Sequence, residues 1–400
     1  MAARTVRFLH ASDFRLHEPL RGALYLNETI QKLLLDAPLE SVCRVFQYAV
    51  QEKVDFVLLS GDLLHPLQTS PHCWTVLLEQ FRHLADQGVM VYWAGGASDG
   101  PEQWPPGIEL PANVVHFSSR RWTRCVHEVD GEPAVVIYGK STPAGGRFTG
   151  RDLPAGEGEP LAVAVCNAEV DADTLTAGAI RYWALGGRHV KRTLIEQPKR
   201  IAHYPGTPQA RTPAHGESHG CTLVEIDPDG NLQAVHIPVD RARFCTERIF
   251  VRDGIPQGEL VRVLAERARQ SCARADGRLL LITWEIESGP ATSAWMLRDD
   301  VLAELVEQLA AAAVTTGWWP WGVVPLIDGE LPGAWYGEQS LLGDYLRTAR
   351  QAEQGELVLG APEYLPADDA FALPDSMATP TARRRLKEAC IIGTAALRGA

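Results

Sequence analysis

Short apolar runs alternate with amphipathic segments along the first quarter of the chain. The segments at 39–50 and 73–85 repeat apolar residues every three or four positions, which predicts helices. The apolar runs before, between and after them predict strands at 6–11, 54–60 and 89–95. Because continuous apolar strands separated by helices are typical of a sheet covered on both faces, this region predicts an α/β fold.

Strands predominate in the pattern after residue 113. Apolar runs predict them at 113–119, 134–141, 161–168 and 182–187. A hairpin is predicted at 220–239, where two alternating runs are joined by Pro-Asp-Gly. Residues 1–240 therefore predict one domain, an α/β sandwich.

The rest of the chain predicts a smaller α/β domain at 245–330, followed by a linker and a helical C-terminal tail at 331–400. The predicted strands and helices of the small domain lie, in chain order, at 248–254, 257–270, 278–288 and 298–314. In the tail, a Pro-broken linker at 361–375 precedes a basic helix at 381–399.

The composition of the chain disfavours several classes of protein. The net charge of −12 disfavours a protein that holds nucleic acid by bulk electrostatics, although it leaves room for a local basic groove. The eight cysteines include no CxxC pair, which fits reduced thiols in a cytoplasm. No apolar run has the length of a membrane span, and the N-terminus carries no signal-peptide pattern, so we expect a cytoplasmic protein without a membrane anchor.

Polar residues follow several of the predicted strands directly. Asp13 and Asp62 come after the first two strands, and His189 follows the strand at 182–187. In an α/β sheet, functional groups collect just beyond the carboxyl ends of the strands. Two carboxylates and one imidazole are suitable ligands for a divalent ion such as manganese. Each of them is also an ordinary loop residue, and only their arrangement in space separates the two interpretations.

Longer stretches resemble a known family. The stretches that carry the resemblance are "FLHASDFRLHEPLRG", "VDFVLLSGDLLH", "VYWAGGASD", "YWALGGRHVKRTLIEQPKRIAHYPGTPQAR" and "GESHGCTLVEID". They resemble the calcineurin-like metallophosphoesterases and, more narrowly, the SbcD/YhaO-type DNA-repair exonucleases. The resemblance covers residues 4 to about 240. It implies a β-sandwich flanked by helices, with a DNA-capping domain in the place of 245–330.

The resemblance also implies a set of metal ligands, of which this chain keeps a part. Asp13, Asp62 and His189 match ligand positions of the family. Asn167 stands where the family has a lone histidine and offers at most a weak carbonyl ligand. Gly187 stands where the family has another histidine and offers no side chain.

Three more family positions are altered. Arg15 replaces a ligating histidine, Ala97 replaces a ligating asparagine, and Ser98 replaces the histidine that assists catalysis. Asp99, the partner of that catalytic histidine, is kept. Most of the lost ligands belong to one of the family's two metals, so hydrolysis by a metal pair should fail.

The resemblance places Arg15 at the metal position for which this chain retains most of the family's ligands. A guanidinium stays protonated at physiological pH and competes with a divalent ion for nearby carboxylates. Our hypothesis is that Arg15 acts as a built-in cation beside Asp13 and Asp62; the alternative is that Arg15 points into solvent. The sequence thus predicts either no cofactor or a single divalent metal, with manganese the expected ion.

Three functions are consistent with these residues. The first is a catalytically impaired member of the exonuclease family, acting as a structural or DNA-end-associated subunit with an SbcC-type coiled-coil ATPase, alone or as an oligomer. The second is an active metal-dependent exonuclease or phosphodiesterase that uses one metal or relocated ligands. The third is an unrelated binding protein on the same scaffold. The histidines that could supply relocated ligands are His17, His65, His203, His215 and His219.

Overall fold

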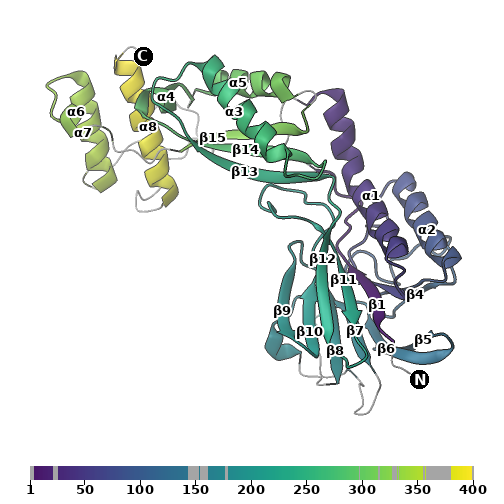
Figure 1. Ribbon diagram of the computed structural model, residues 1–400. Coiled ribbons are helices and arrows are strands. Elements are labelled where there is room, and N and C mark those ends of the chain that lie inside the picture. The colour runs from purple at the N-terminus through teal and green to yellow at the C-terminus, as the bar shows by residue number, and fades with distance from the viewer. Residues whose placement is uncertain are drawn as a thin grey trace. The chain divides into compact units, whose positions relative to one another are not determined.

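The chain forms two compact units, one of residues 1–22 and 26–244 and the other of residues 23–25 and 245–400. A computed structural model describes residues 4–20, 26–142, 153, 161–175, 179–296, 298–313, 316–326, 331, 333–354, 356 and 380–398 (Figure 1). The predicted linker at 361–375 lies outside the described residues.

The first sheet of the first unit has the strand order β12-β11-β1-β2-β3-β4. Its strands are β1 (Val6–Ala11), β2 (Phe56–Leu59), β3 (Met90–Trp93), β4 (Val114–His116), β11 (Gly220–Ile226) and β12 (Leu232–Pro238). The four strands from β1 to β4 are parallel, and β11 and β12 add the predicted hairpin antiparallel to them. The carboxyl ends of β1, β2 and β3 therefore lie at one edge.

The second sheet of this unit has the order β5-β6-β7-β8-β10-β9. Its strands are β5 (Thr123–Val129), β6 (Glu132–Lys140), β7 (Ala162–Asn167), β8 (Ile180–Gly186), β9 (Arg192–Gln197) and β10 (Arg200–Tyr204). The inner strands β6, β7, β8 and β10 are parallel, whereas β5 and β9 pair antiparallel at the edges. A short 3₁₀ helix, η2 (Ala172–Thr174), follows β7.

Two long helices accompany the first sheet. Helix α1 (Glu28–Gln51) begins well before the predicted start at 39, because Asn27 caps it and the helix continues through Pro38. Helix α2 (Pro71–Asp86) is capped by Ser70 and has Pro71 in its first turn, where a proline costs no hydrogen bond.

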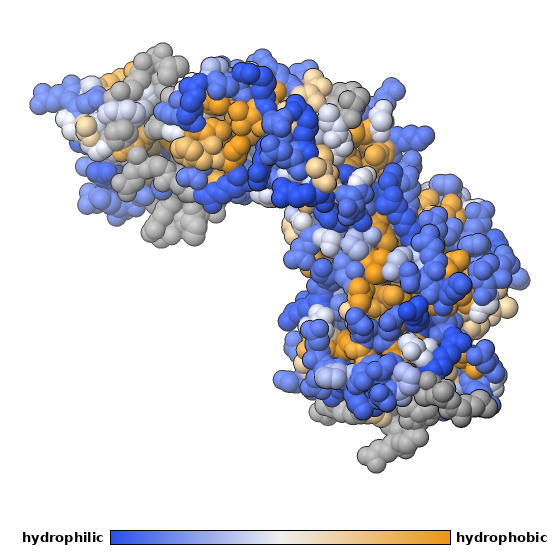
Figure 2. All heavy atoms as spheres, viewed as in Figure 1, coloured by the Kyte–Doolittle hydropathy of each residue, from blue (hydrophilic) through white to orange (hydrophobic). Residues whose placement is uncertain are grey.

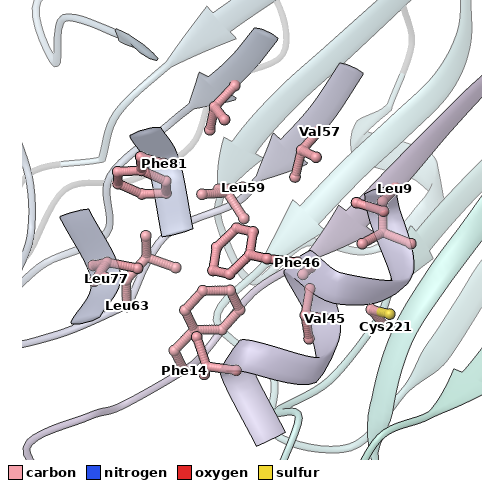
Figure 3. Close-up of a cluster of buried hydrophobic side chains, with 14 of the residues drawn as sticks. Leu9, Phe14, Val45, Phe46, Val57, Leu59, Leu63, Leu77, Phe81 and Cys221 are labelled. Atoms are coloured by element: carbon pink, nitrogen blue, oxygen red, sulfur yellow. The ribbon is translucent and has the colours of Figure 1, made fainter. Parts of the chain in front are cut away.

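Alternating side chains of the first sheet enter two different cores. Leu9 and Val57 face the helices, whereas Phe8 and Phe56 face the second sheet and fill the interior of the sandwich. In the helix-facing core the ring of Phe46 on α1 lies 5.8 Å from that of Phe14 and 5.7 Å from that of Phe81, between centroids (Figure 3). Because Phe14 is fully buried, it anchors the loop that follows β1.

The second unit contains a three-stranded sheet of order β13-β14-β15. Its elements are β13 (Ala242–Phe250), α3 (Gln257–Cys272), β14 (Leu279–Glu287), α4 (Pro290–Met296), α5 (Asp299–Ala313), β15 (Trp318–Leu326), α6 (Gly333–Tyr336), α7 (Leu341–Gln354) and α8 (Pro380–Arg398). Strand β15 comes from a Trp-, Pro- and Gly-rich stretch for which the pattern predicted no element. Helices α7 and α8 pack through Leu342, Leu346 and Ile391.

The mixed α/β architecture confirms the predicted fold class and is consistent with a metallophosphoesterase fold. On the face shown in Figure 2, hydrophilic residues cover most of each unit and hydrophobic ones gather in smaller patches. All eight cysteines are free. Among the described helices, none is long and apolar enough to cross a bilayer.

Candidate functional site

The residues singled out in the sequence lie where strand ends of the two sheets of the first unit meet. Gly186, at the end of β8, packs so closely on β2 that a Cβ atom there would lie 1.7 Å from the carbonyl oxygen of Ser60. Asn167 ends β7 and donates from Nδ2 to Ser60 O at 2.9 Å. The loops after β1, β2, β3 and β8 converge around this contact, and we call the polar region between them the crevice.

The backbone of the crevice is held in an uncommon conformation. Asp13, Arg15 and Asp62 have φ of 53°, 46° and 55°, in the left-handed region that non-glycine residues rarely adopt. The loops support each other, because Asp13 N donates to Gly61 O at 2.9 Å and Arg15 N donates to Asp62 O at 3.0 Å. Such strain persists only where the surroundings enforce it, and it is concentrated at functional sites.

Asp13 is buried and only partly satisfied. Its Oδ2 accepts from the Ser12 hydroxyl at 2.6 Å and from the Gly187 N–H at 3.0 Å. Its Oδ1 is buried and has no hydrogen-bond partner among the described residues. Burial first, and the neighbouring Asp62 second, raise the pKa of Asp13 to about 8. A protonated Asp13 therefore predominates near neutral pH.

Asp62 is engaged by the protein itself. Asn167 Nδ2 donates to Asp62 Oδ2 at 2.9 Å, so the residue in the place of the lone histidine presents a donor to the carboxylate. On the other side the Gly96 backbone comes so near that a Cβ atom would lie 2.4 Å from Asp62 Oδ1. Both carboxylate oxygens of Asp62 therefore lie against protein groups, Oδ2 against the Asn167 amide and Oδ1 against the Gly96 backbone.

Asp99 supports the backbone of two loops. It is fully buried and accepts from the N–H groups of Asp62 at 3.0 Å, Leu63 at 2.7 Å and Gly96 at 2.6 Å. Burial and then Asp62 raise the pKa of Asp99 to about 7 despite these donors. The Ser98 hydroxyl reaches Asp62 Oδ1 at 3.5 Å, whereas the Ala97 side chain is exposed.

Arg15 points into the crevice, where it contacts Glu18 and His189. Its Nε donates to Glu18 Oε2 at 2.8 Å, and a second bond forms between Nη2 and Glu18 Oε1. Its Nη1 contacts His189 Nε2. Burial first, and then Arg15 and His215, lower the pKa of His189, so its neutral ring accepts this hydrogen bond.

We hypothesised that Arg15 is a built-in cation beside Asp13 and Asp62, and the side chain does interact with both electrostatically. Among the described residues its ion pair is with Glu18, and it acts on Asp13 and Asp62 through electrostatic interactions without direct contact. Sequence reasoning missed Glu18, which matches none of the ligand or catalytic positions that the resemblance implies. An arginine near a carboxylate three residues later was the available signal.

Residues of the stretch "YPGTPQAR" hold two loops of the crevice in place. Buried Arg211 donates from Nε to Glu18 O at 2.8 Å and from Nη2 to Phe14 O at 2.7 Å. Thr207 N donates to His189 O at 3.0 Å. The two Arg211 contacts join residues 193 and 197 positions apart, so local sequence patterns could not reveal them.

The described residues do not fit the metal pair that the resemblance implies. They contain no group of three His, Cys, Asp or Glu side chains placed to hold a metal ion. His189 Nε2 faces a guanidinium, Asp62 Oδ2 faces an amide donor, and Gly187 supplies only its N–H. Asp13 Oδ1 is buried without a hydrogen-bond partner among the described residues, as are Nδ1 of His17 and Nδ1 of His215.

The candidate relocated ligands form no such group either. His203 is bound by Thr193 and Thr222, and His219 by two backbone carbonyls. The rings of His189 and His215 lie 5.4 Å apart, and those of His17 and His65 lie 5.8 Å apart, between centroids.

Known proteins were compared with the chain to identify the family that it resembles. The chain is similar to a metallophosphoesterase. It is 31% identical over 236 residues to a Bacillus subtilis (strain 168) protein named uncharacterized metallophosphoesterase YhaO. The match covers 55% of this chain and 57% of the relative, so the chain spans little more than half of that protein. No family model matches the chain. This similarity supports the resemblance at the level of metallophosphoesterases, whereas the exonuclease subfamily and the altered site stay predictions.

Proposed function

We propose that this protein is a metallophosphoesterase-family protein that no longer hydrolyses phosphodiesters through a metal pair. It acts instead as a structural, DNA-end-associated subunit beside an SbcC-type ATPase. The observation that carries the proposal is the contact between the Arg15 guanidinium and His189 Nε2. A nitrogen that accepts this hydrogen bond has no free lone pair for a metal.

Electrostatics support the same conclusion. Two unit charges about 4 Å apart interact by about 4 kcal/mol at an effective dielectric constant near 20, and a divalent ion doubles this value. A metal beside Asp13 and Asp62 would be repelled by Arg15, which Glu18 holds in place. Hydrolysis by two metals needs both ions to clamp the attacking and leaving oxygens.

The last two helices of the second unit, α7 and α8, form the surface that we propose binds the partner. Helices α7 and α8 pack on each other and leave apolar side chains exposed, with Leu341 71% and Ile392 44% exposed. Exposed apolar positions on paired helices suit the addition of further helices, such as those of a coiled-coil ATPase. Co-purification with that ATPase that is lost in Leu341→Glu/Ile392→Glu would support this part of the proposal, and unchanged co-purification would contradict it.

The proposal is tested with bis(p-nitrophenyl) phosphate and with linear double-stranded DNA in excess manganese. We expect no hydrolysis above the protein-free blank. Manganese-dependent hydrolysis that disappears in Asp62→Ala and persists in Asp86→Ala, a change of the same kind at an exposed residue of α2, would contradict the proposal.

The alternative is a phosphodiesterase that works with a single metal, and one observation favours it. Asp13 Oδ1 is buried without a partner, as a ligand to a cation would be. The same hydrolysis assay decides between the two functions, because the alternative requires activity that depends on both Asp13 and manganese.

A further inference from the structure

The segment that follows β8 forms a cationic pocket beside the crevice. Arg188, Lys191 and Arg192 line a pocket of about 420 Å³ together with His189 and His215. No described carboxylate forms an ion pair with Lys191 or Arg192, and Arg188 pairs with Glu169, which is 71% exposed. Three permanent cations thus surround a small polar hollow in a chain of net charge −12.

The pocket is held rigidly by the protein beneath it. Gly206, with φ of 77°, packs so closely that a Cβ atom would lie 2.8 Å from both His189 O and Lys191 N. Thr207 N also bonds to His189 O, and the Arg188 guanidinium lies over the Tyr204 ring at 5.4 Å from its centroid. Because the loop is already ordered, an anion that binds it loses little affinity to ordering the loop.

A second hollow lies next to the first and shares two of its cations. Lys191 and Arg192 also line a pocket of about 280 Å³, whose other polar lining residues are Thr193, Glu196, His203, Thr222 and His236. Glu196 is the one carboxylate among its described lining residues, against two permanent cations. Among the described residues, no Phe, Tyr or Trp lines either pocket, and these residues therefore provide no aromatic platform for a base. Neighbouring cationic hollows without such a platform suit successive phosphates of a strand better than a single nucleotide.

We propose that these two pockets bind the phosphate backbone of a nucleic-acid strand without a metal ion. Lys and Arg side chains neutralise backbone phosphates irrespective of base sequence, and each contact contributes to the salt dependence of binding. The choice of a nucleic acid as ligand rests on the proposed function, and the two pockets are the surface that contacts the strand. It requires no hydrolytic chemistry.

The test is fluorescence anisotropy of a fluorescein-labelled oligothymidylate with the full chain in EDTA. We expect salt-sensitive binding that Lys191→Glu/Arg192→Glu weakens about tenfold or more. The slope of log K against log salt should fall by about 1.4, since two contacts to a single strand are lost. The matched control Lys32→Glu/Arg82→Glu makes the same change in net charge at exposed positions of α1 and α2 and should retain wild-type binding.

Several results would overturn the inference. Equal weakening in the control variant would mean that net charge alone drives binding, and no binding by the wild type would remove the site. Binding only with manganese would contradict its metal independence. Equally effective competition by inorganic phosphate, at the same phosphate concentration as unlabelled oligothymidylate, would show that the ligand is a small anion and not a strand.

Failure of the proposed function has a separate readout, manganese-dependent hydrolysis, which this assay does not measure. Circular dichroism of each variant checks that the fold is intact.

Discussion

The loops after β3 and β8 border the same crevice, and both lack side chains that the resemblance to metallophosphoesterases would require. The first loop has Ala97 and Ser98 and turns inward, so that Gly96 packs on Asp62 and Asp99 binds three backbone N–H groups. The second loop has Gly187 and presents its cations to a pocket.

We propose that the two loops lost their metal ligands with different structural consequences. The loop after β3 has become part of the packed frame, since its polar groups are consumed by neighbouring backbone. The loop after β8 keeps its charges available to a ligand. We therefore expect substitutions in the first loop to act on stability and substitutions in the second to act on binding.

Among the substitutions that test this comparison, Asp99→Ala has the largest expected effect. It leaves three buried N–H groups without an acceptor, and we expect the free energy of unfolding to fall by about 4 kcal/mol. Urea denaturation measures the loss. Asp86→Ala, at an exposed position, should change stability by less than about 0.5 kcal/mol. A loss for Asp99→Ala as small as that of this control would mean that the first loop is not part of the frame.

Gly206→Ala tests the support of the second loop. The added Cβ would collide with His189 O and Lys191 N, and alanine disfavours the positive φ, so we expect a loss of about 2–4 kcal/mol and weaker oligothymidylate binding. Gly88→Ala is the matched control, because Gly88 has a similar φ of 74° but open space around its Cβ position. That variant should lose only about 1 kcal/mol. Equal losses would show that backbone strain alone, without packing, explains both.

Asp13→Asn tests whether Asp13 is a buried neutral carboxyl group or a charged metal ligand. The pKa of Asp13 is raised to about 8 in the folded protein and is about 3.9 when unfolded, so its contribution to stability is complete below about pH 4 and is lost as the pH rises through 8. We expect Asp13→Asn to be more stable than the wild type at pH 9 by about 1–3 kcal/mol. The difference should shrink as the pH falls. Buried histidines affect both proteins alike, so denaturation curves at several pH values isolate Asp13. A destabilised variant at pH 9 would argue for a charged Asp13 that the protein needs.

Arg15→Gln has the smallest expected effect. The pKa of His189 should rise, because Arg15 lowers it, but it should stay below the ordinary value, because burial is the larger cause. NMR titration of the imidazole measures the shift. Arg188→Gln removes a cation that is not among the main causes of the lowered His189 pKa, so it should change this pKa less than Arg15→Gln does. No shift in Arg15→Gln would mean that the guanidinium does not face the ring.

The sequence predicted those features that depend on local pattern. Strands β1, β2 and β3 and their order along the chain follow from apolar periodicity, and the convergence of Asp13, Asp62 and His189 follows from where parallel strands end. The early start of α1 was missed, because an internal proline such as Pro38 usually marks a boundary. Strand β15 was missed, because Pro320 and Gly322 break the strand pattern in the sequence.

The partners of the site residues could not be predicted. Which groups Arg15 and Arg211 contact depends on how loops far apart in the chain pack together. The cationic pocket likewise depends on Gly206 holding the loop after β8 in place, a contact that no local pattern encodes.

We propose that hydrogen-bond donors of the protein take the place of a metal at Asp62 and His189. Metal analysis of the full chain, dialysed against excess manganese and then desalted, is the decisive measurement. We expect no stoichiometric manganese in the wild type. Stoichiometric manganese that is lost in Asp62→Ala would show that these donors do not exclude a metal.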